Sequence, residues 1–132
     1  MASFIRAHCR LVLPGFAKHG PLPLEEVLDF EEVTTCLPVV QEVLQGFPAE
    51  SAYRTARDAL LSLPIVESPL EESLFLEAAN LYRAARRRGL TVRSATDCLI
   101  AACALRHDLE VLHRDRDYQQ LSAVSPLKAR AA

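Results

Sequence analysis

The amino-acid sequence predicts one α/β domain built around a parallel sheet, and two observations lead to this expectation. Short β-branched and apolar segments, typical of buried strands, alternate along the chain with longer segments whose apolar residues follow a helical period. The chain has 132 residues, of which 50% are apolar, and this suits a single domain with its own core. We see no repeat, no low-complexity linker and no second domain, so we expect residues 1–132 to form one unit.

The first half of the predicted domain contains two strands and three helices. The β-branched segment 33–37 (VTTCL) predicts a strand, and Pro38 then suits the first turn of a helix that stops at Gly46. Helical spacing of apolar residues predicts a helix over 50–63, and 64–68 (PIVES) predicts a second strand. A capping-box pattern over 68–71 predicts a helix that starts at Pro69 and ends at Gly89.

The second half repeats this alternation. A second capping-box pattern, Ser94-x-x-Asp97, opens a helix whose residues 98–107 are apolar almost all round, so we expect that helix to be buried. Residues 109–113 (LEVLH) predict a strand and 117–124 (DYQQLSAV) a last short helix. The tail, residues 125–132, is expected to be loose.

Composition excludes several functional classes. The net charge of -2 excludes a uniformly basic nucleic-acid-binding protein, so contact with nucleic acid would need a local basic patch or a metal. The four cysteines form no C-x-x-C pair and show no zinc-type spacing with the histidines, which favours the reducing cytoplasm. No apolar stretch is long enough to span a membrane. The basic start of the chain loosely resembles a targeting segment, but Pro14 and Gly15 interrupt its apolar part.

Acidic residues stand where the predicted elements would bring them to one edge of the sheet. Asp115 comes just after the strand 109–113, Glu42 lies one helical turn beyond the strand 33–37, and Asp97 lies at a helix N-terminus. Ligands of parallel sheets bind at the carboxyl ends of the strands. Clustered carboxylates repel one another, and a divalent cation such as Mg²⁺ or Mn²⁺ removes that penalty. A metal held in this way can activate water for attack on a phosphodiester.

Each of these residues also has a purely structural interpretation. Asp97 could be a capping acid, Glu42 an exposed helix acid, and Asp115 or Asp117 a cap of the last helix, with Asp117 the more structural of the two. Tyr118 is interpreted as a core residue. Four arginines near the end of the helix 69–88 would either complement its dipole on a solvated face or contact RNA phosphates: Arg83, Arg86, Arg87 and Arg88.

The segment 96–118 (TDCLIAACALRHDLEVLHRDRDY) closely resembles the C-terminal motif of PIN-domain ribonucleases, especially the VapC-type toxins of toxin–antitoxin pairs. The segment 36–47 (CLPVVQEVLQGF) is similar to their helix-borne glutamate motif, and 81–97 resembles the stretch that precedes their central aspartate. The resemblance covers roughly residues 21–124. It implies a PIN-like three-layer α/β/α domain and a metal-dependent endoribonuclease using Mg²⁺ or Mn²⁺, often a homodimer, that acts on RNA and is held inactive by a cognate antitoxin.

The resemblance also implies the roles of individual residues. Glu42 matches the family's helix glutamate, Asp97 its main C-terminal metal ligand, and Asp115 the acid after the last core strand, so these three would hold the metal. Asp117 matches the next acid of the same motif and would assist catalysis.

The start of the chain departs from the family pattern. The family's first strand ends in an aspartate, but here no Asp or Glu precedes Glu25, and Asp29 fits a helix instead. Residues 9–13 (CRLVL) are the only stretch that we expect could serve as that strand. Residues 1–20 therefore look replaced, which suggests either a frameshift or misassigned start, or a degenerate relative with a weakened metal site. The alternative function is accordingly a catalytically degenerate PIN-like binding module.

Overall fold

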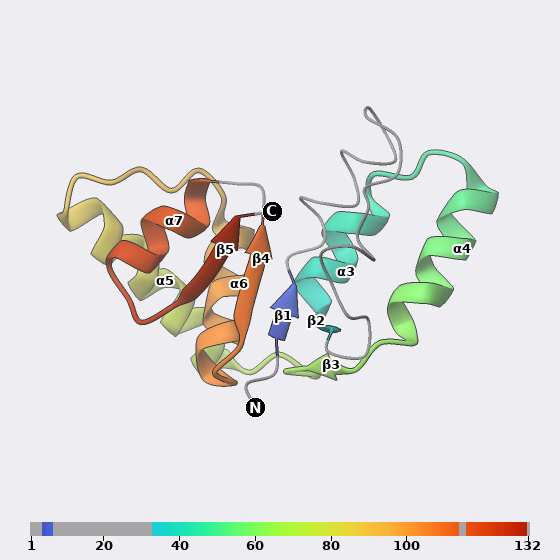
Figure 1. The fold of residues 1–132 in the computed structure, drawn as a ribbon, viewed down its shortest axis with the longest axis horizontal. Coiled ribbons are helices and arrows are strands. Elements are labelled where there is room, and N and C mark those ends of the chain that lie inside the picture. Colours follow the sequence, from blue (N-terminus) through green and yellow to red (C-terminus); the bar gives the residue numbers. More distant parts are fainter. Residues whose placement is uncertain (1–3, 7–32, 114–115, 132) are drawn as a thin grey trace.

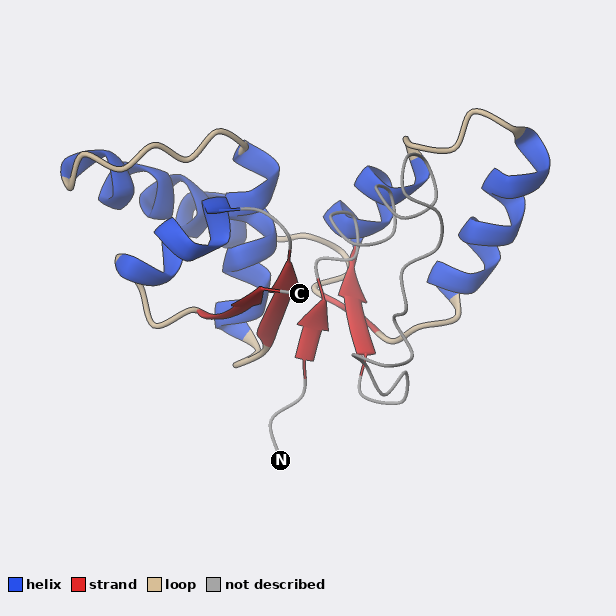
Figure 2. Ribbon diagram, turned by 45° about the horizontal axis from the view of Figure 1, so that its top comes forward, coloured by secondary structure: helices blue, strands red, loops and turns tan. Residues whose placement is uncertain are grey.

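The computed structural model describes residues 4–6, 33–113 and 116–131. Its five strands are all parallel and stand in the order β3-β2-β1-β4-β5. Two groups of helices flank the sheet: α3 and α4 lie on the side of β2, while α5, α6 and α7 lie on the side of β4 and β5 (Figures 1 and 2). The predicted α/β fold with a parallel sheet is confirmed. Within the described ranges, no helix is both long and apolar enough to cross a bilayer.

The centre of the sheet is β1 (Phe4–Arg6). It pairs with β2 (Val33–Cys36) through Phe4↔Val33 and with β4 (Glu110–His113) through Phe4↔Glu110. The expectation that only residues 9–13 could supply the first strand is therefore wrong, because the chain uses residues 4–6. Residues 9–13 lie outside the described part, and so do most of residues 1–20, so the hypothesis of a replaced start stays a prediction.

On one side of the sheet the elements follow the sequence-based expectation closely. The helix α3 (Leu37–Leu44) begins directly after β2 with Pro38 in its first turn, and it buries Pro38, Val39, Val40 and Val43. A second helix, α4 (Glu50–Leu61), then leads to the two-residue strand β3 (Ile65–Val66), which pairs with the outer edge of β2. β2 thus feeds straight into α3, so α3 starts at the carboxyl end of the sheet.

The helix α5 (Glu72–Arg87) begins later than predicted. Its N-cap is Glu71 and receives no side-chain cap, so the capping box over 68–71 and the start at Pro69 are wrong. Glu67 has a positive φ of 53°, which takes the chain away from helical geometry just before this point. The predicted stop at Gly89 is confirmed: its φ is +75°, a conformation that glycine adopts without steric cost. The buried face carries Leu74, Ala78, Leu81 and Ala85.

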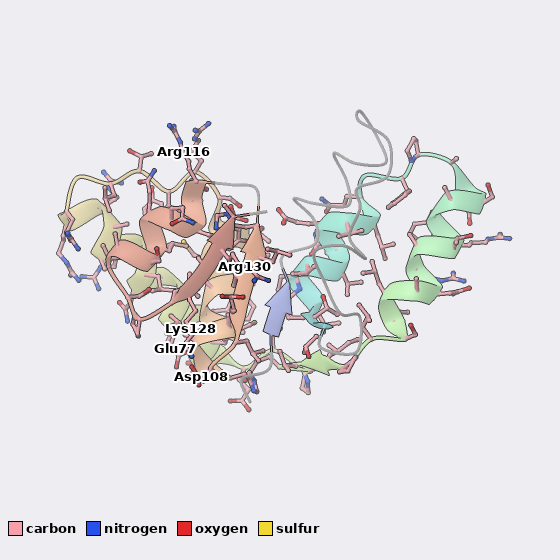
Figure 3. The ribbon with its side chains drawn as sticks, viewed as in Figure 1. Glu77, Asp108, Arg116, Lys128 and Arg130 are labelled. Carbon is pink, nitrogen blue, oxygen red and sulfur yellow. The ribbon has the colours of Figure 1, made fainter. Side chains whose placement is uncertain are left out.

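The helix α6 (Ala95–Arg106) is buried over most of its length, as its apolar sequence predicts. It leads into β4, and α7 (Arg116–Ala123) follows. The tail is not loose: β5 (Lys128–Ala131) pairs with all four residues of β4. Two ion pairs accompany this pairing, Lys128 Nζ to Asp108 Oδ1 at 3.0 Å and Arg130 Nε to Glu110 Oε1 at 3.5 Å. Figure 3 labels Lys128, Asp108 and Arg130. Backbone pairing therefore orders a segment whose sequence is polar.

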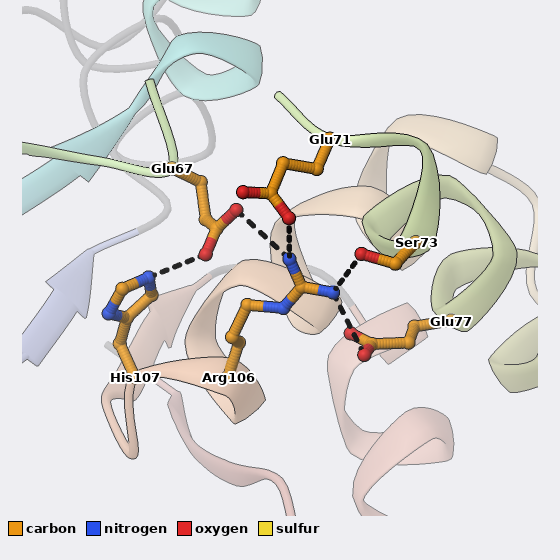
Figure 4. A network of polar contacts seen from close by, with 6 residues as sticks. All are labelled: Glu67, Glu71, Ser73, Glu77, Arg106 and His107. Carbon is orange, nitrogen blue, oxygen red and sulfur yellow. Dashed lines mark hydrogen bonds and ion pairs between the residues drawn. The ribbon is translucent and has the colours of Figure 1, made fainter. Parts of the chain in front are cut away.

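A polar network joins the C-terminal end of α6 to the segment between β3 and α5 (Figure 4). The guanidinium of Arg106 pairs with Glu67 at 3.2 Å, with Glu77 at 2.9 Å and more weakly with Glu71 at 3.8 Å. His107 Nε2 lies 2.9 Å from the other carboxylate oxygen of Glu67. The hydrogen bond to Glu77, together with the charges around it, raises the pKa of Arg106 above its ordinary value. The network fixes three chain segments relative to one another.

Candidate active site

The topology brings the elements that bear the candidate acids to the carboxyl end of the sheet. β2 and β4 are parallel and lie on either side of β1, so both end at the same edge. α3, which carries Glu42, starts where β2 ends, and α7, which carries Asp117, follows β4. The N-terminal turn of α6, which carries Asp97, packs beside α7. This is the edge at which ligands of parallel sheets bind.

Asp97 is fully buried in the first turn of α6. Its backbone N–H donates to Ser94 Oγ at 3.2 Å, which confirms the cap at Ser94. Its Oδ1 accepts a hydrogen bond of 2.9 Å from the Tyr118 hydroxyl. The cap therefore fixes the backbone of Asp97 while the side chain is directed toward α7, so the structural and functional interpretations of this residue are compatible.

Asp117 is 1% exposed and fastens α7 to the segment that precedes α6. Its Oδ2 accepts hydrogen bonds from the backbone N–H groups of Arg93, at 3.0 Å, and Ser94, at 3.2 Å. The interpretation of Asp117 as a cap of its own helix is incomplete, because these contacts reach across to another element. By holding Ser94, Asp117 also holds the residue that caps α6 and thereby positions Asp97.

Of the other two candidate acids, Glu42 and Asp115, only Glu42 lies within the described residues. Glu42 lies in α3, half-buried, and α3 contacts α6. Asp115 lies outside the described residues. In the described part of the chain, no three His, Cys, Asp or Glu side chains gather closely enough to hold a metal ion. The structure thus brings Asp97 and Asp117 together, and the joint ligand set of Asp97, Glu42 and Asp115 stays a prediction.

The pKa of the Cys98 thiol is affected by both buried acids. Its pKa is raised to about 11, first by burial and then by the negative charges of Asp97 and Asp117. A thiol whose ionisation is opposed by two carboxylates lies in a region of negative potential. Such a region attracts cations, and carboxylate oxygens are the donors that hard divalent cations prefer. The chemistry of these donors therefore fits the metal that the family resemblance implies.

Tyr118 is the residue whose role the sequence interpretation missed. It is fully buried, as expected of a core residue, but its hydroxyl binds the predicted main metal ligand. Its ring also packs against His113, with centroids 5.2 Å apart, and His113 Nε2 contacts Gln119 Nε2 at 3.0 Å. A signal was present, because a buried tyrosine normally needs a hydrogen-bond partner for its hydroxyl and a phenylalanine does not.

The arginines near the end of α5 have separate local contacts. Arg88 Nη1 donates to the backbone oxygen of Ala123 and so ties α5 to α7. Arg83 Nη1 donates to Asn80 Oδ1 at 3.1 Å, and the Arg86 guanidinium stands 6.0 Å from the centroid of the Tyr82 ring. At least Arg88 is therefore a structural residue.

Comparison with known proteins assigns the family. The family model described as the PIN domain matches residues 17–124. The chain is 38% identical to Ribonuclease VapC11 of Mycobacterium tuberculosis (strain ATCC 25618 / H37Rv) over 98 residues, which cover 74% of this chain and 72% of that protein. It is 30% identical to Ribonuclease VapC17 of the same strain over 122 residues, which cover 91% and 85%.

Solved structures agree in fold. The crystal structure of VapBC2 from Rickettsia felis bound to a promoter DNA fragment superposes with a TM-score of 0.72 at 15% identity, covering 100% of this chain and 99% of that one. VapBC-5 from Mycobacterium tuberculosis gives a TM-score of 0.71 at 17% identity and covers both chains fully. Together with the parallel sheet and the buried acids at its carboxyl edge, these matches show that the chain belongs to the PIN-domain family.

Proposed function

We propose that this protein is a metal-dependent endoribonuclease of the VapC type and the toxin of a toxin–antitoxin pair. The observation that carries the proposal is the fully buried Asp97, held at the carboxyl edge of a PIN-domain sheet by Tyr118 and Ser94. Relatives that are up to 38% identical over most of the chain are named ribonucleases, which supports the reaction class. The substrate is RNA, and the reaction is hydrolysis of a phosphodiester bond.

Asp97, Glu42 and Asp115 would hold the metal, Mg²⁺ or Mn²⁺. When bound, that ion supplies Lewis-acid chemistry that activates water and offsets the negative charge developing on the phosphate. Two residues of the chain position the Asp97 carboxylate. The Tyr118 hydroxyl donates a hydrogen bond to Oδ1 of Asp97 and so fixes the orientation of this carboxylate, including its second oxygen. Asp117 assists by fixing the backbone at Ser94, from which α6 begins.

The proposed partners follow from the family. Structures of similar fold are VapBC complexes, which supports a cognate antitoxin as a partner of this chain. We further propose a homodimer located in the cytoplasm.

A catalytically degenerate binding module is the competing function. The observation in its favour is that β1 carries no acid and that no acid follows it before Glu25. The ribonuclease is nevertheless the better supported function, because relatives named ribonucleases align with the region that contains Asp97.

The test is cleavage of structured RNA with Mg²⁺ or Mn²⁺ by the wild-type chain and by Asp97→Asn. Asparagine keeps the backbone cap and can still accept the hydrogen bond from Tyr118, so we expect the fold to persist. Losing a charged metal ligand should lower the cleavage rate by at least about 100-fold. The matched control is Asp58→Asn, an exposed acid of α4, which should cleave like wild type. No cleavage by the wild-type chain would instead support the degenerate module, and cleavage without a divalent metal would contradict the metal-dependent mechanism.

A further inference from the structure

Most arginine side chains in the described part of the chain have a partner. Arg106 and Arg130 form ion pairs, for example, and others contact an acid, an amide, an aromatic ring or a backbone oxygen. Three arginines, Arg87, Arg93 and Arg116, are exposed and have no side-chain hydrogen bond or ion pair within the described residues. Because an exposed cation of this kind contributes little to stability, each raises the question of what its charge is for.

The helix dipole explains the position of one of these cations but not of the other two. Arg87 is the last residue of α5, where a cation complements the negative end of the dipole. Arg116 is the first residue of α7, and Arg93 directly precedes Ser94, the N-cap of α6. Both therefore stand at the positive end of a helix, where a cation is unfavourable. The helices gain nothing from Arg93 or Arg116.

Both of these arginines flank the buried Asp117. Its carboxylate accepts the backbone N–H of Arg93 at 3.0 Å, and Arg116 is the residue before Asp117 in the chain. The residue after it, Tyr118, binds Asp97 through its hydroxyl. Figure 3 shows Arg116 at the start of α7, at the end of the sheet toward which β4 points. The backbones of both arginines thus adjoin the candidate active site, while their side chains are exposed.

We propose that Arg93 and Arg116 bind phosphates of the RNA strand next to the bond that is cleaved. This inference rests on the proposed function, because it takes RNA as the substrate. The chain carries a net charge of -2 and the candidate active site is acidic, so a polyanion needs local cations to approach that site. A strand whose phosphodiester lies at Asp97 carries its neighbouring phosphates across the surface formed by these two arginines.

The position of the two arginines favours RNA over an acidic protein segment. Cations directly beside the acids that would hold the metal place a phosphate polymer for cleavage, whereas an acidic peptide gains nothing from that closeness. Contacts to phosphates position a nucleic acid without reading its bases. Arg93 and Arg116 should therefore increase affinity for RNA of any sequence, and they should act on binding more than on the chemical step.

The test is the affinity of the full-length chain for fluorescein-labelled single-stranded RNA, measured by fluorescence anisotropy in Mg²⁺ at several salt concentrations. Every sample carries Asp97→Asn, so that cleavage is slow during the titration. Arg93→Ala and Arg116→Ala should each weaken binding by about fivefold or more, and each should reduce the salt slope by about 0.7. Lysine at either position keeps the charge and should retain most of the affinity. Arg54→Ala, an exposed site on α4, is the control and should bind like the parent.

The outcomes separate this inference from the proposed function. Unchanged affinity and salt slope in both alanine variants would overturn phosphate contact and leave an acidic protein segment as the occupant. An equal loss in Arg54→Ala would overturn it as a general effect of net charge, and a loss that lysine does not recover would assign the arginines a structural role.

Cleavage kinetics with Asp97 intact give the second measurement. Both alanine variants should raise KM and leave kcat near the wild-type value, because they remove binding that is equal in the ground state and the transition state. A chain that binds RNA through these arginines without cleaving it contradicts the nuclease and leaves this inference standing. Cleavage by the alanine variants with wild-type KM overturns this inference alone.

Discussion

The two ends of α6 hold acidic side chains in opposite ways. At its C-terminal end, Glu67 and Glu77 bind the guanidinium of Arg106, and Glu67 also contacts His107. At its N-terminal end, Asp97 is held by a tyrosine hydroxyl and Asp117 by two backbone amides. Among the contacts within the described residues, those at the first end pair acids with ionisable cations, and those at the second end come from a hydroxyl and from backbone amides.

This difference separates a structural cluster from a candidate active site. A cation that pairs with a carboxylate cancels its charge and leaves little for a ligand to gain. A hydroxyl or a backbone amide orients a carboxylate without cancelling its charge. The charges of Asp97 and Asp117 contribute, after burial, to the raised pKa of Cys98. Carboxylates that are fixed in position and still charged are what a divalent metal requires. The comparison can be tested by weakening the contacts at each end in turn.

Replacing Asp117 should have the largest effect on stability. Asp117→Ala removes a buried carboxylate that accepts two backbone hydrogen bonds, and it leaves the N–H groups of Arg93 and Ser94 to find new partners. We expect the free energy of unfolding to fall by about 3 kcal/mol, since hydrogen bonds to charged groups contribute more than neutral ones. Urea denaturation followed by circular dichroism measures this. A loss below about 1 kcal/mol would show that Asp117 does not fasten α7 to α6.

Breaking the cationic cluster should cost less than removing Asp117. Arg106→Met keeps much of the side-chain volume but leaves Glu67, whose side chain is only 10% exposed, without its guanidinium partner. Water screens the more exposed Glu71 and Glu77, so their share of the loss should be small. The control is Arg54→Met, which breaks an exposed ion pair with Glu50. Equal melting temperatures for the two variants would contradict a structural role for the Arg106 cluster.

The sequence predicted the elements that carry strong local signals and missed those that depend on distant partners. The helix α6 has an apolar period and a serine cap, so both its burial and its start were predictable. β5 reads KARA, which has no strand pattern, and it is ordered by pairing with β4. β1 is only three residues long and owes its place to pairing with strands on both sides. Local propensity cannot reveal such strands.

The candidate site shows the same division. The position of Asp97 at a helix start followed from its neighbours in the sequence. That Asp117 holds residues 93 and 94, and that Tyr118 binds Asp97, depends on α6 and α7 lying side by side, which spacing along the chain does not encode. The Arg106 cluster also joins residues up to 40 positions apart, so no local sequence motif predicts it. These contacts became predictable only after the topology was known.

A smaller effect should follow from removing the Tyr118 hydroxyl. Tyr118→Phe keeps the ring packed against His113 but removes the donor to Asp97 Oδ1. We expect a loss of about 1.5 kcal/mol, as for one hydrogen bond to a charged group. If the hydroxyl orients Asp97, this variant should also bind Mn²⁺ more weakly by calorimetry. Tyr53→Phe, on the far helix α4, is the control for loss of a phenol hydroxyl. Unchanged Mn²⁺ affinity in Tyr118→Phe would confine its role to stability.

The smallest effect concerns Cys98 and the pH dependence of stability. In the folded chain its pKa is about 11, above the ordinary value of 9.0, because the thiol is buried beside Asp97 and Asp117. Above pH 9 the unfolded chain releases this proton while the folded chain retains it. The contribution of Cys98 to stability is therefore complete well below pH 9, begins to fall as the pH nears 9, and is lost as the pH rises through about 11.

Between about pH 7.5 and 9, this linkage should lower the free energy of unfolding by about 0.4 kcal/mol. Cys98→Ala should lose that much less than the wild-type chain over the same interval, whatever its stability at pH 7.5. The control is Cys103→Ala, which removes a buried thiol five residues farther along α6. If Cys98→Ala and the wild-type chain lose stability in parallel, the negative potential at the start of α6 is weaker than the geometry implies. In that case the contrast between the two ends of α6 would lie in their hydrogen bonds and not in their charge.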